Sequence, residues 1–193
     1  MKTISKFHHL IWYLYEIYQQ TQPNLNFSIR IASHMKPDDT DWELLATLQR
    51  DASPSNQALA EQVRISPPTA LRRVRRLHEE GLIERQVALL DEDRIAALQG
   101  HGLTAIVEVT LDRQGAEHLE AFERRAVQDD AVRQCYRVAP GPDFVLIVRM
   151  PDMPAYQALA ERLFTQDANV RNVRSFFSVK RAKFETQVPL ARG

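Results

Sequence analysis

The sequence predicts an α+β protein, in which an N-terminal winged helix-turn-helix domain precedes a C-terminal ferredoxin-like βαββαβ domain. Three observations carry this prediction. Apolar residues recur at helical spacing in three short segments between residues 40 and 80. The hydrophobic period changes from about 3.6 to about 2 residues near residue 104. Beyond that point the pattern follows the order βαββαβ, which builds an antiparallel sheet with two helices on one face.

Composition sets broad limits on the protein class. A chain of 193 residues with 44% hydrophobic residues suits one or two domains with an apolar core. Because 25 basic residues balance 25 acidic ones, the net charge gives no argument that the protein binds nucleic acid. Only a local cluster of positive charge can argue for such binding. Cys135 is the one cysteine and cannot form an internal disulfide. This favours a cytoplasmic protein in which Cys135 is a small buried apolar side chain.

Residues 1–37 precede the two-domain pattern and are interpreted as an N-terminal extension, helical in part or not native to the protein. Segment 7–18, FHHLIWYLYEIY, is apolar and aromatic but too short to span a membrane, and it contains Glu16. No small-residue cleavage site follows it, which argues against a signal peptide. We expect no membrane association, and at most one helix over about residues 9–20.

The first helix of the DNA-binding domain is expected to start at a capping box, TDWE. In this box the side chain of Thr40 accepts a hydrogen bond from the backbone N–H three residues on, and the side chain of Glu43 reaches back to the backbone N–H of Thr40. The helix is expected to run to about Arg50. Ser55 is expected to cap a second helix over residues 56–63. The tight connection RIS then leads into a third helix rich in arginine, and such a pair of helices is a helix-turn-helix candidate.

The third helix carries a concentration of positive charge. Ser66 is its expected N-cap, Pro67 occupies its first position, where a missing N–H is harmless, and Gly81 ends it. Residues 64–78 hold five arginines and no acid. A solvated helix face is the plainer explanation, but such faces usually mix both signs. We therefore interpret this segment as a DNA-recognition helix.

Helical geometry divides this helix into two faces. The core-facing side is expected to hold Ala70, Val74 and Leu77. The opposite face, pointing away from the core, is expected to hold Thr69, Arg72, Arg73 and Arg76. A helix fits the major groove of B-DNA, where arginine binds guanine edges or phosphates, and Arg75, nearer the edge, suits a phosphate. The candidate DNA-binding residues are Ser66, Pro68, Thr69, Arg72, Arg73, Arg75 and Arg76.

The segment after the third helix is expected to close the DNA-binding domain, which would span residues 38–92. Its apolar residues, among them Val87 and Leu89, favour a short β-hairpin or an extended wing. Residues 93–103 end in LQGHGL, and their two glycines favour a linker, preceded by one helical turn at most.

The second domain is expected over residues 104–193. Its strands and helices are predicted at 104–111 (strand), 114–127 (helix), 132–138 (strand), 144–150 (strand), 154–166 (helix) and 170–190 (strand). The buried stripe of the first of these helices is expected to include Phe122, Ala126 and Val127.

Over about residues 38–190 the chain resembles the Lrp/AsnC, or feast/famine, transcription regulators. The resemblance lies in LAEQV, SP, RRVRRLHEEGLI and ALLD in the first half, and in GPDF and KFETQVPL in the second. It implies a regulator that binds double-stranded DNA, has a RAM-type effector-binding domain, and forms dimers that assemble into octamers. Two positions depart from the family pattern. Arg64 stands where the family usually has glycine, which costs about 1 kcal/mol if φ is positive there, and Ser53 stands where it often has arginine.

The loop VAPGPDF is the candidate effector site. Its prolines stiffen the connection and remove backbone donors, and Gly141 lets a ligand approach the main chain. The carboxylate of Asp143 suits the ammonium group of an apolar or small polar amino acid. The resemblance implies binding at this loop between subunits of neighbouring dimers, where a facing strand adds further residues. The candidate effector-binding residues are Ala139, Gly141, Pro142, Asp143, Ser175 and Phe177. The plainer alternative is a rigid turn in which Asp143 caps its own backbone.

Catalysis is not expected. The sequence shows no catalytic motif, no metal-ligand spacing among its six histidines, and no motif for a cofactor. Two alternatives remain. Some proteins similar to this family decarboxylate tetrapyrroles of the sirohaem type, but those tend to have a degenerate DNA-reading helix. A metabolite sensor that acts without DNA is disfavoured by Arg72 and Arg73.

Overall fold

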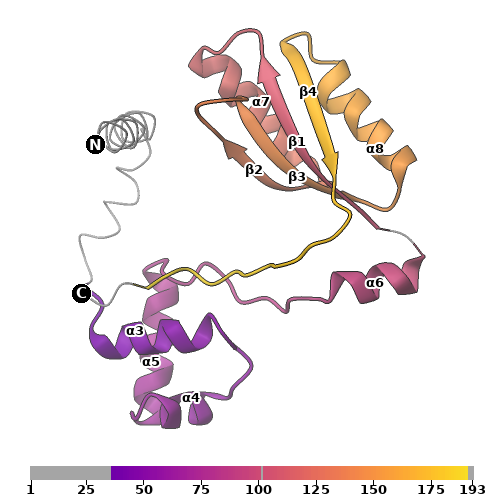
Figure 1. Ribbon diagram of the computed structural model, residues 1–193. Coiled ribbons are helices and arrows are strands. Elements are labelled where there is room, and N and C mark those ends of the chain that lie inside the picture. Colours follow the sequence, from indigo (N-terminus) through magenta and orange to yellow (C-terminus); the bar gives the residue numbers. More distant parts are fainter. Residues whose placement is uncertain (1–35, 101, 191–193) are drawn as a thin grey trace, which may run out of the picture. The chain divides into compact units, whose positions relative to one another are not determined.

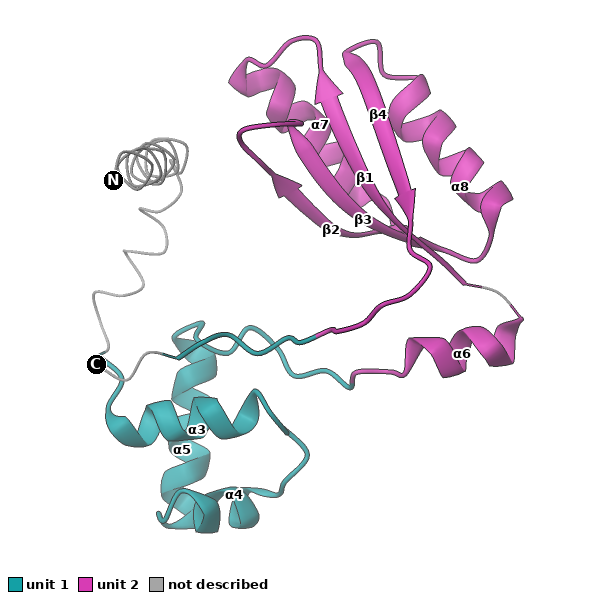
Figure 2. Ribbon diagram, viewed as in Figure 1, with its two compact units in different colours: residues 1–88, 185–193 teal, residues 89–184 magenta. Residues whose placement is uncertain are grey.

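The computed structural model describes residues 36–100 and 102–190. The described residues form two compact units (Figure 2), one with residues 36–88 and 185–190, the other with residues 89–100 and 102–184. The helix expected near residues 9–20 lies outside the described residues.

The first unit is a three-helix domain (Figure 1) made of α3 (Asp39–Leu48), α4 (Asn56–Gln62) and α5 (Pro67–Glu79). Its helices bury a small apolar core, whose fully packed members are Leu44, Leu59, Val63 and Leu77. Ala70 is also fully buried and Val74 packs against the core, as the helical spacing predicted. The predicted core-facing side of the arginine-rich helix is therefore confirmed.

The cap of α3 differs from the predicted one. Asp38 is the N-cap, and its side chain accepts a hydrogen bond from the backbone N–H of Asp41 at 2.9 Å. Asp41 accepts in return from the N–H of Asp38 at 3.1 Å, so these two residues form the capping box. The prediction of Thr40 as the cap was wrong, because the sequence DDTD offers several competing caps and the one two residues earlier forms.

The other helix ends of this unit mostly follow the sequence. The side chain of Ser55 accepts from the N–H of Ala58 at 3.3 Å and caps α4 as predicted. Gly81 has a φ of +72°, the left-handed conformation expected after α5.

Residues 84–91 contain no strand, so the hairpin form of the expected wing is absent. Val87 and Leu89 stay more than 60% exposed there, which leaves them without the packing that stabilises a hairpin.

A helix, α6 (Glu92–Gln99), occupies most of the segment expected to be a linker. The side chain of Asp91 caps it by accepting from the N–H of Arg94 at 3.0 Å, and Gly100 ends it with a φ of +74°. Its residues are largely exposed, Leu98 to 84%, so the segment has no apolar stripe that could predict a helix. Glu92 pairs with the guanidinium groups of Arg149 and Arg181 and so anchors the start of α6 within the second unit.

The second unit has the predicted βαββαβ order. It consists of β1 (Leu103–Leu111), α7 (Ala116–Gln128), β2 (Val132–Arg137), β3 (Phe144–Met150), α8 (Met153–Ala160), a π-helical turn (Glu161–Thr165) and β4 (Val170–Phe177). The sheet order is β2-β3-β1-β4, and all neighbouring strands are antiparallel. This is the ferredoxin-like arrangement.

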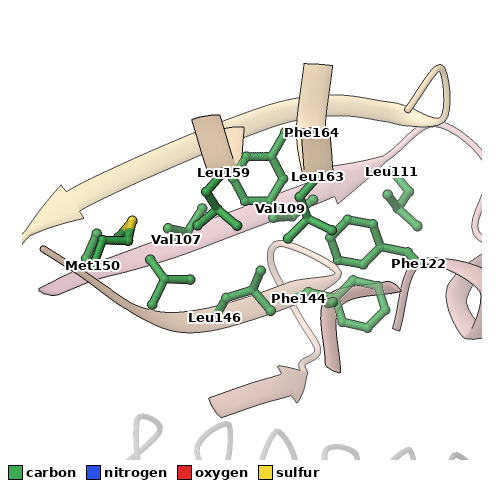
Figure 3. Packing of buried hydrophobic residues seen from close by; sticks show 13 residues of the cluster. Val107, Val109, Leu111, Phe122, Phe144, Leu146, Met150, Leu159, Leu163 and Phe164 are labelled. Atoms are coloured by element: carbon green, nitrogen blue, oxygen red, sulfur yellow. The ribbon is translucent and has the colours of Figure 1, made fainter. Parts of the chain in front are cut away.

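The core of the second unit lies between one face of the sheet and the helices α7 and α8 (Figure 3). Alternate residues of β1 are buried, as the period of two predicted. β3 was predicted as a nearly continuous apolar strand, and it too buries alternate residues. The rings of Phe122 and Phe144 pack with centroids 4.8 Å apart. Val127 was expected in this core but is 59% exposed, because five helical positions turn it well away from Phe122.

The C-terminal segment is not a strand beyond Phe177. Residues 178–190 have no regular secondary structure, so the strand predicted up to residue 190 is shorter by thirteen residues. Residues from Glu185 belong to the first unit. There the N–H of Val188 donates to the side-chain oxygen of Gln49 at 3.0 Å, at the end of α3.

Candidate DNA-binding site and effector loop

The N-terminal end of α5 presents two hydroxyl groups and lacks two of the usual backbone donors. Ser66 occupies the N-cap position, as predicted, but its hydroxyl lies 2.8 Å from the hydroxyl of Thr69 and caps no backbone N–H. Pro67 and Pro68 fill the first two helical positions and have no N–H. Ser66 and Pro68 are exposed and Thr69 is half-buried. This end of the helix therefore offers polar side chains and an apolar ring to a partner.

Two of the four helix arginines are available at the surface. Arg72 is exposed and has no ion pair within the described residues. Arg75 pairs with Glu79 at 3.1 Å, but the two side chains are 79% and 65% exposed. A surface pair of this kind contributes little and is readily exchanged for another anion.

The other two arginines are engaged by the first helix. Arg73 donates from Nη1 to Asp38 and to Asp41, each at 2.8 Å. Arg76 donates from Nη2 to both oxygens of Asp41, at 2.9 and 2.7 Å. The expectation that Arg73 and Arg76 point away from the domain was therefore wrong. Helical geometry gives the angle of a residue on its own helix, but it does not reveal an acid on a neighbouring helix.

The acids and arginines of this cluster hold each other in place. Asp41 is 1% exposed, so its carboxylate depends on these donors for the hydrogen bonds that water would otherwise give. The backbone N–H of Asp41 and then the guanidinium of Arg73 lower the pKa of the Asp38 carboxyl. Hydrogen bonds to Asp38 and then Asp41 raise the pKa of Arg73. We call Asp38, Asp41, Arg73 and Arg76 the clamp, because they fix α5 against α3.

The turn between α4 and α5 contains a strained residue. Arg64 has a φ of +58° and is the one non-glycine residue with positive φ in residues 36–100 and 102–190. A side chain in this conformation costs about 1 kcal/mol relative to the usual helical region. The strain expected for a positive φ at this position is therefore present.

The candidate effector loop follows β2 and is held against the end of β1. Gly141 has a φ of +131°, which only glycine adopts readily, and a Cβ added there would meet no atom within 4 Å. The space over this residue is therefore open. Ala139 is exposed and Pro142 half-buried in the same loop.

One carboxylate oxygen of Asp143 already accepts hydrogen bonds from within the chain. Its Oδ2 accepts from the backbone N–H of Leu111 at 2.7 Å and from the side chain of Gln114 at 3.3 Å. It therefore ties the loop to β1, whereas the plainer alternative had it capping its own backbone. Its Oδ1 accepts no hydrogen bond from the described residues, which leaves an acceptor for a ligand.

Within one chain Ser175 and Phe177 do not reach this loop. Both lie on β4, where Tyr156 contacts the hydroxyl of Ser175 and packs edge-to-face on Phe177, with ring centroids 5.0 Å apart. Phe177 pairs with Ala105, whereas the loop leads into Phe144, which pairs with Val109. Four positions along β1 separate these pairs by about 13 Å. Ser175 pairs with Val107, two positions from Val109, and β1 lies between its strand and β3. Ser175 and Phe177 could serve the loop only from another chain.

A separate cavity of about 330 Å³ lies between the second helix and the edge strand of this unit. Its lining includes Tyr156, Phe164, Asn172 and Ser175, and it includes no residue of the loop 139–143. Ser175 thus faces this cavity rather than the candidate effector loop.

Asp38 and Asp41 were not predicted as functional partners of the arginine helix. A signal for them exists in the spacing. Asp38 and Asp41 lie three residues apart at the start of one helix, and Arg73 and Arg76 lie three residues apart on the other. Residues three apart share a helix face, so two such pairs of opposite charge are suited to meet.

A helix-turn-helix with exposed arginine and hydroxyl groups on its third helix, followed by a βαββαβ domain with an open loop, defines a DNA-binding regulator with a separate sensing domain. Comparison with known proteins agrees with this class. Residues 37–84 match the winged helix-turn-helix DNA-binding family, and residues 104–188 match the Lrp/AsnC ligand binding domain. The chain belongs to the Lrp/AsnC family of transcriptional regulators.

Individual relatives cover most of the chain. The Bkd operon transcriptional regulator of Pseudomonas aeruginosa is 33% identical over 79% of this chain and 97% of its own length. The leucine-responsive regulatory protein of Escherichia coli is 32% identical over 76% and 87%. Among solved structures, an AsnC family regulator from Agrobacterium tumefaciens has a TM-score of 0.71 at 29% identity, covering 79% and 97%. A Neisseria meningitidis regulator in complex with L-methionine has a TM-score of 0.71 at 27% identity, covering 80% and 97%.

In the part of the chain that the structure describes, no helix is long and apolar enough to cross a membrane. No group of three or more His, Cys, Asp or Glu side chains gathers there in a way that could hold a metal ion.

Proposed function

We propose that this regulator reads DNA through the start of α5, with Arg72 as the base-reading arginine and Arg75 as a phosphate contact. The observation that carries this proposal is the exposure of Arg72 without any ion pair in residues 36–100 and 102–190, next to two arginines that the clamp engages. Arg72 is the sixth residue of α5, and the N-terminal residues of a recognition helix reach base edges. Ser66, Pro68 and Thr69 lie in the same turn and supply two hydroxyls and an apolar ring for bases and phosphates.

The clamp has a different role in this proposal. Arg73 and Arg76 set the angle of α5 and contribute to DNA binding through that angle. Both were expected from the sequence to contact DNA, and the geometry supports a positioning role instead.

The experiment compares the parent protein with the Arg72→Ala variant. The DNA affinity of both is measured on a site that was selected from random duplexes by binding to the parent protein. Affinity for that site should fall by about 1–3 kcal/mol, and discrimination at one base position should relax. The melting temperature should not change, since Arg72 makes no ion pair in the described chain. Unchanged affinity and unchanged base preference would contradict the assignment.

We also propose that an amino acid with an apolar or small polar side chain binds at the loop 139–143. The matched family is a ligand binding domain, and the Neisseria relative was solved with L-methionine. The open space over Gly141 suits the ligand's main-chain end, and the free Oδ1 of Asp143 suits its ammonium group. Which amino acid binds is the question for a screen.

A thermal-shift screen of the twenty amino acids tests this, because a ligand that binds the folded state raises the melting temperature. Asp143→Asn is the informative variant. It keeps an acceptor for the N–H of Leu111 and removes the charge, so the loop should remain while the shift falls. The proposal is wrong if no amino acid shifts the parent, or if the variant keeps the full shift of the best ligand.

Self-association, as dimers that assemble into octamers in the family resemblance, is the third part of the proposal. On the sheet face opposite the core, Ile106 lies beside Phe176, and Tyr136 lies two strands from Ile106, beyond Val145 and Ile147 of β3. Ile106, Tyr136 and Phe176 are 41%, 51% and 45% exposed. A contiguous apolar face of this kind favours contact with a second copy. Phe176→Asp should lower the mass measured by sedimentation equilibrium. A parent chain that sediments as a monomer would exclude the proposal.

We propose that the protein acts in the cytoplasm, without enzymatic activity. Its relatives are transcriptional regulators, and such proteins work where the chromosome is. The rival activity on tetrapyrroles predicts a visible absorption band when sirohaem is added, and the regulator role predicts none.

A further inference from the structure

The recognition helix lacks part of the usual anion-binding capacity of a helix N-terminus. Backbone N–H groups of the first turn ordinarily donate to a phosphate. Pro67 and Pro68 have none, and the N–H of Ala70 donates to the carbonyl of Ser66 at 3.0 Å, so that Thr69 has the one remaining backbone donor among residues 67–70. With two backbone donors missing, a phosphate beside this end of α5 is held more strongly if a side chain adds positive charge.

Arg64 supplies such a side chain two residues before the N-cap. Two residues span at most about 7 Å of extended chain, so an arginine side chain at this point reaches the start of α5. Arg64 is exposed, and within residues 36–100 and 102–190 it forms no ion pair. It shares this state with Arg72, whereas Arg75 pairs with Glu79 and the remaining two arginines are engaged by the clamp.

The backbone at Arg64 is also unfavourable for any residue with a side chain. Its φ of +58° lies in the region that glycine adopts without strain. Strained backbone positions occur preferentially where a side chain has a function. Here the strain and the free charge coincide in one residue, directly in front of the recognition helix.

We infer that Arg64 contacts a DNA phosphate that flanks the site read by α5. The contact replaces the backbone donors that Pro67 and Pro68 remove, and it is independent of base sequence. The inference rests on the proposed role of α5 as the DNA-reading helix.

Three substitutions in the full chain separate the charge of Arg64 from its backbone strain. Arg64→Lys keeps both, Arg64→Ala removes the charge and keeps the strain, and Arg64→Gly removes both. Binding is measured on a random-sequence duplex over a range of salt concentrations, since a phosphate contact needs no operator. Thermal unfolding of each variant is measured in parallel. Arg94→Ala, an exposed arginine on α6, is the control for the loss of one surface charge.

In Arg64→Gly we expect the stability of the protein to rise and its affinity for DNA to fall. Its melting temperature should rise by a few degrees, and the slope of log affinity against log salt should flatten by about 0.9 for each phosphate that the protein no longer neutralises. Arg64→Ala should show the same flattening without the rise, and Arg64→Lys should keep the parental slope. A parental slope in both the alanine and the glycine variants would overturn the inference.

A second measurement distinguishes a wrong role for Arg64 from a wrong assignment of α5 as the DNA-reading helix. If Arg72→Ala with Arg75→Ala weakens binding to the same duplex while the Arg64 variants do not, only the role of Arg64 is excluded. If the double variant also binds like the parent, α5 is not the DNA-reading helix and both assignments fall.

Discussion

Arg76 donates from Nη2 to both carboxylate oxygens of Asp41, at 2.9 and 2.7 Å, although the two residues lie 35 positions apart in the chain. The pair joins the last turn of the arginine-rich helix to the first turn of α3, and Arg73 joins the same acid from one turn earlier. A helix-turn-helix reads DNA only if its recognition helix is held at a fixed angle. Two of the four arginines of α5 therefore hold this helix against α3.

Asp41→Ala should destabilise the protein by about 3 kcal/mol. It leaves two arginines without their buried acceptor, and breaking a buried pair costs about 3–5 kcal/mol, which partial exposure of Arg76 reduces here. Asp39→Ala is the matched control. It removes a neighbouring exposed acid and should cost a few tenths of a kcal/mol at most. Urea unfolding of both variants measures the difference, and equal midpoints would mean that the clamp does not stabilise the fold.

Acid should weaken the clamp through Asp38. The pKa of this carboxyl is lowered in the folded state, so its contribution is present above the unfolded pKa, near pH 4, and is lost as pH falls through the folded pKa. Asp38→Asn should be less stable than the parent at neutral pH, and the two melting temperatures should converge below about pH 4. A constant difference across the whole pH range would show that the charge of Asp38 contributes nothing.

Cys135 should be slow to react in the folded protein. Burial, followed by the charge of Glu123, raises the pKa of its thiol to about 11, so little thiolate exists at neutral pH. The chain has one cysteine, which makes alkylation by iodoacetamide a clean readout. Alkylation at about pH 7.5, where a free thiol is partly ionised, should be slow in buffer and rapid in urea. A rate in buffer equal to that of a free thiol would contradict this environment.

A chain that starts at Met35 should bind DNA and assemble as the full chain does. The matched families lie entirely within residues 37–188, and both the clamp and the effector loop are complete within that range. Gel-shift and sedimentation measurements on both chains test this. Loss of either property would assign residues 1–34 a role in the regulator.

Regular elements with a strong apolar period were predictable from the sequence. The alternation of β1 predicted the buried face of that strand, and the helical spacing predicted that Ala70 and Leu77 face the core of the first unit. These predictions succeed because burial of one face imposes a period on the residues of that face.

Features that depend on a partner from elsewhere in the chain were not predictable in this way. A helical wheel cannot show that Asp41 lies opposite Arg73 and Arg76, because their meeting depends on how α3 packs on α5. α6 buries no residue, so no apolar period marks it. Ser175 faces Tyr156 for a similar reason, since the register of β4 and the position of α8 decide its neighbours.

In the proposed regulator the four arginines of α5 divide into two that contact DNA and two that hold the domain together. The most direct test measures unfolding free energy and affinity for a selected site in the single alanine variants at positions 72, 73, 75 and 76. Arg72→Ala and Arg75→Ala should lose affinity at unchanged stability, and Arg73→Ala and Arg76→Ala should lose stability. Full stability in the Arg73 and Arg76 variants, with a loss of affinity equal to that of Arg72→Ala, would contradict the division.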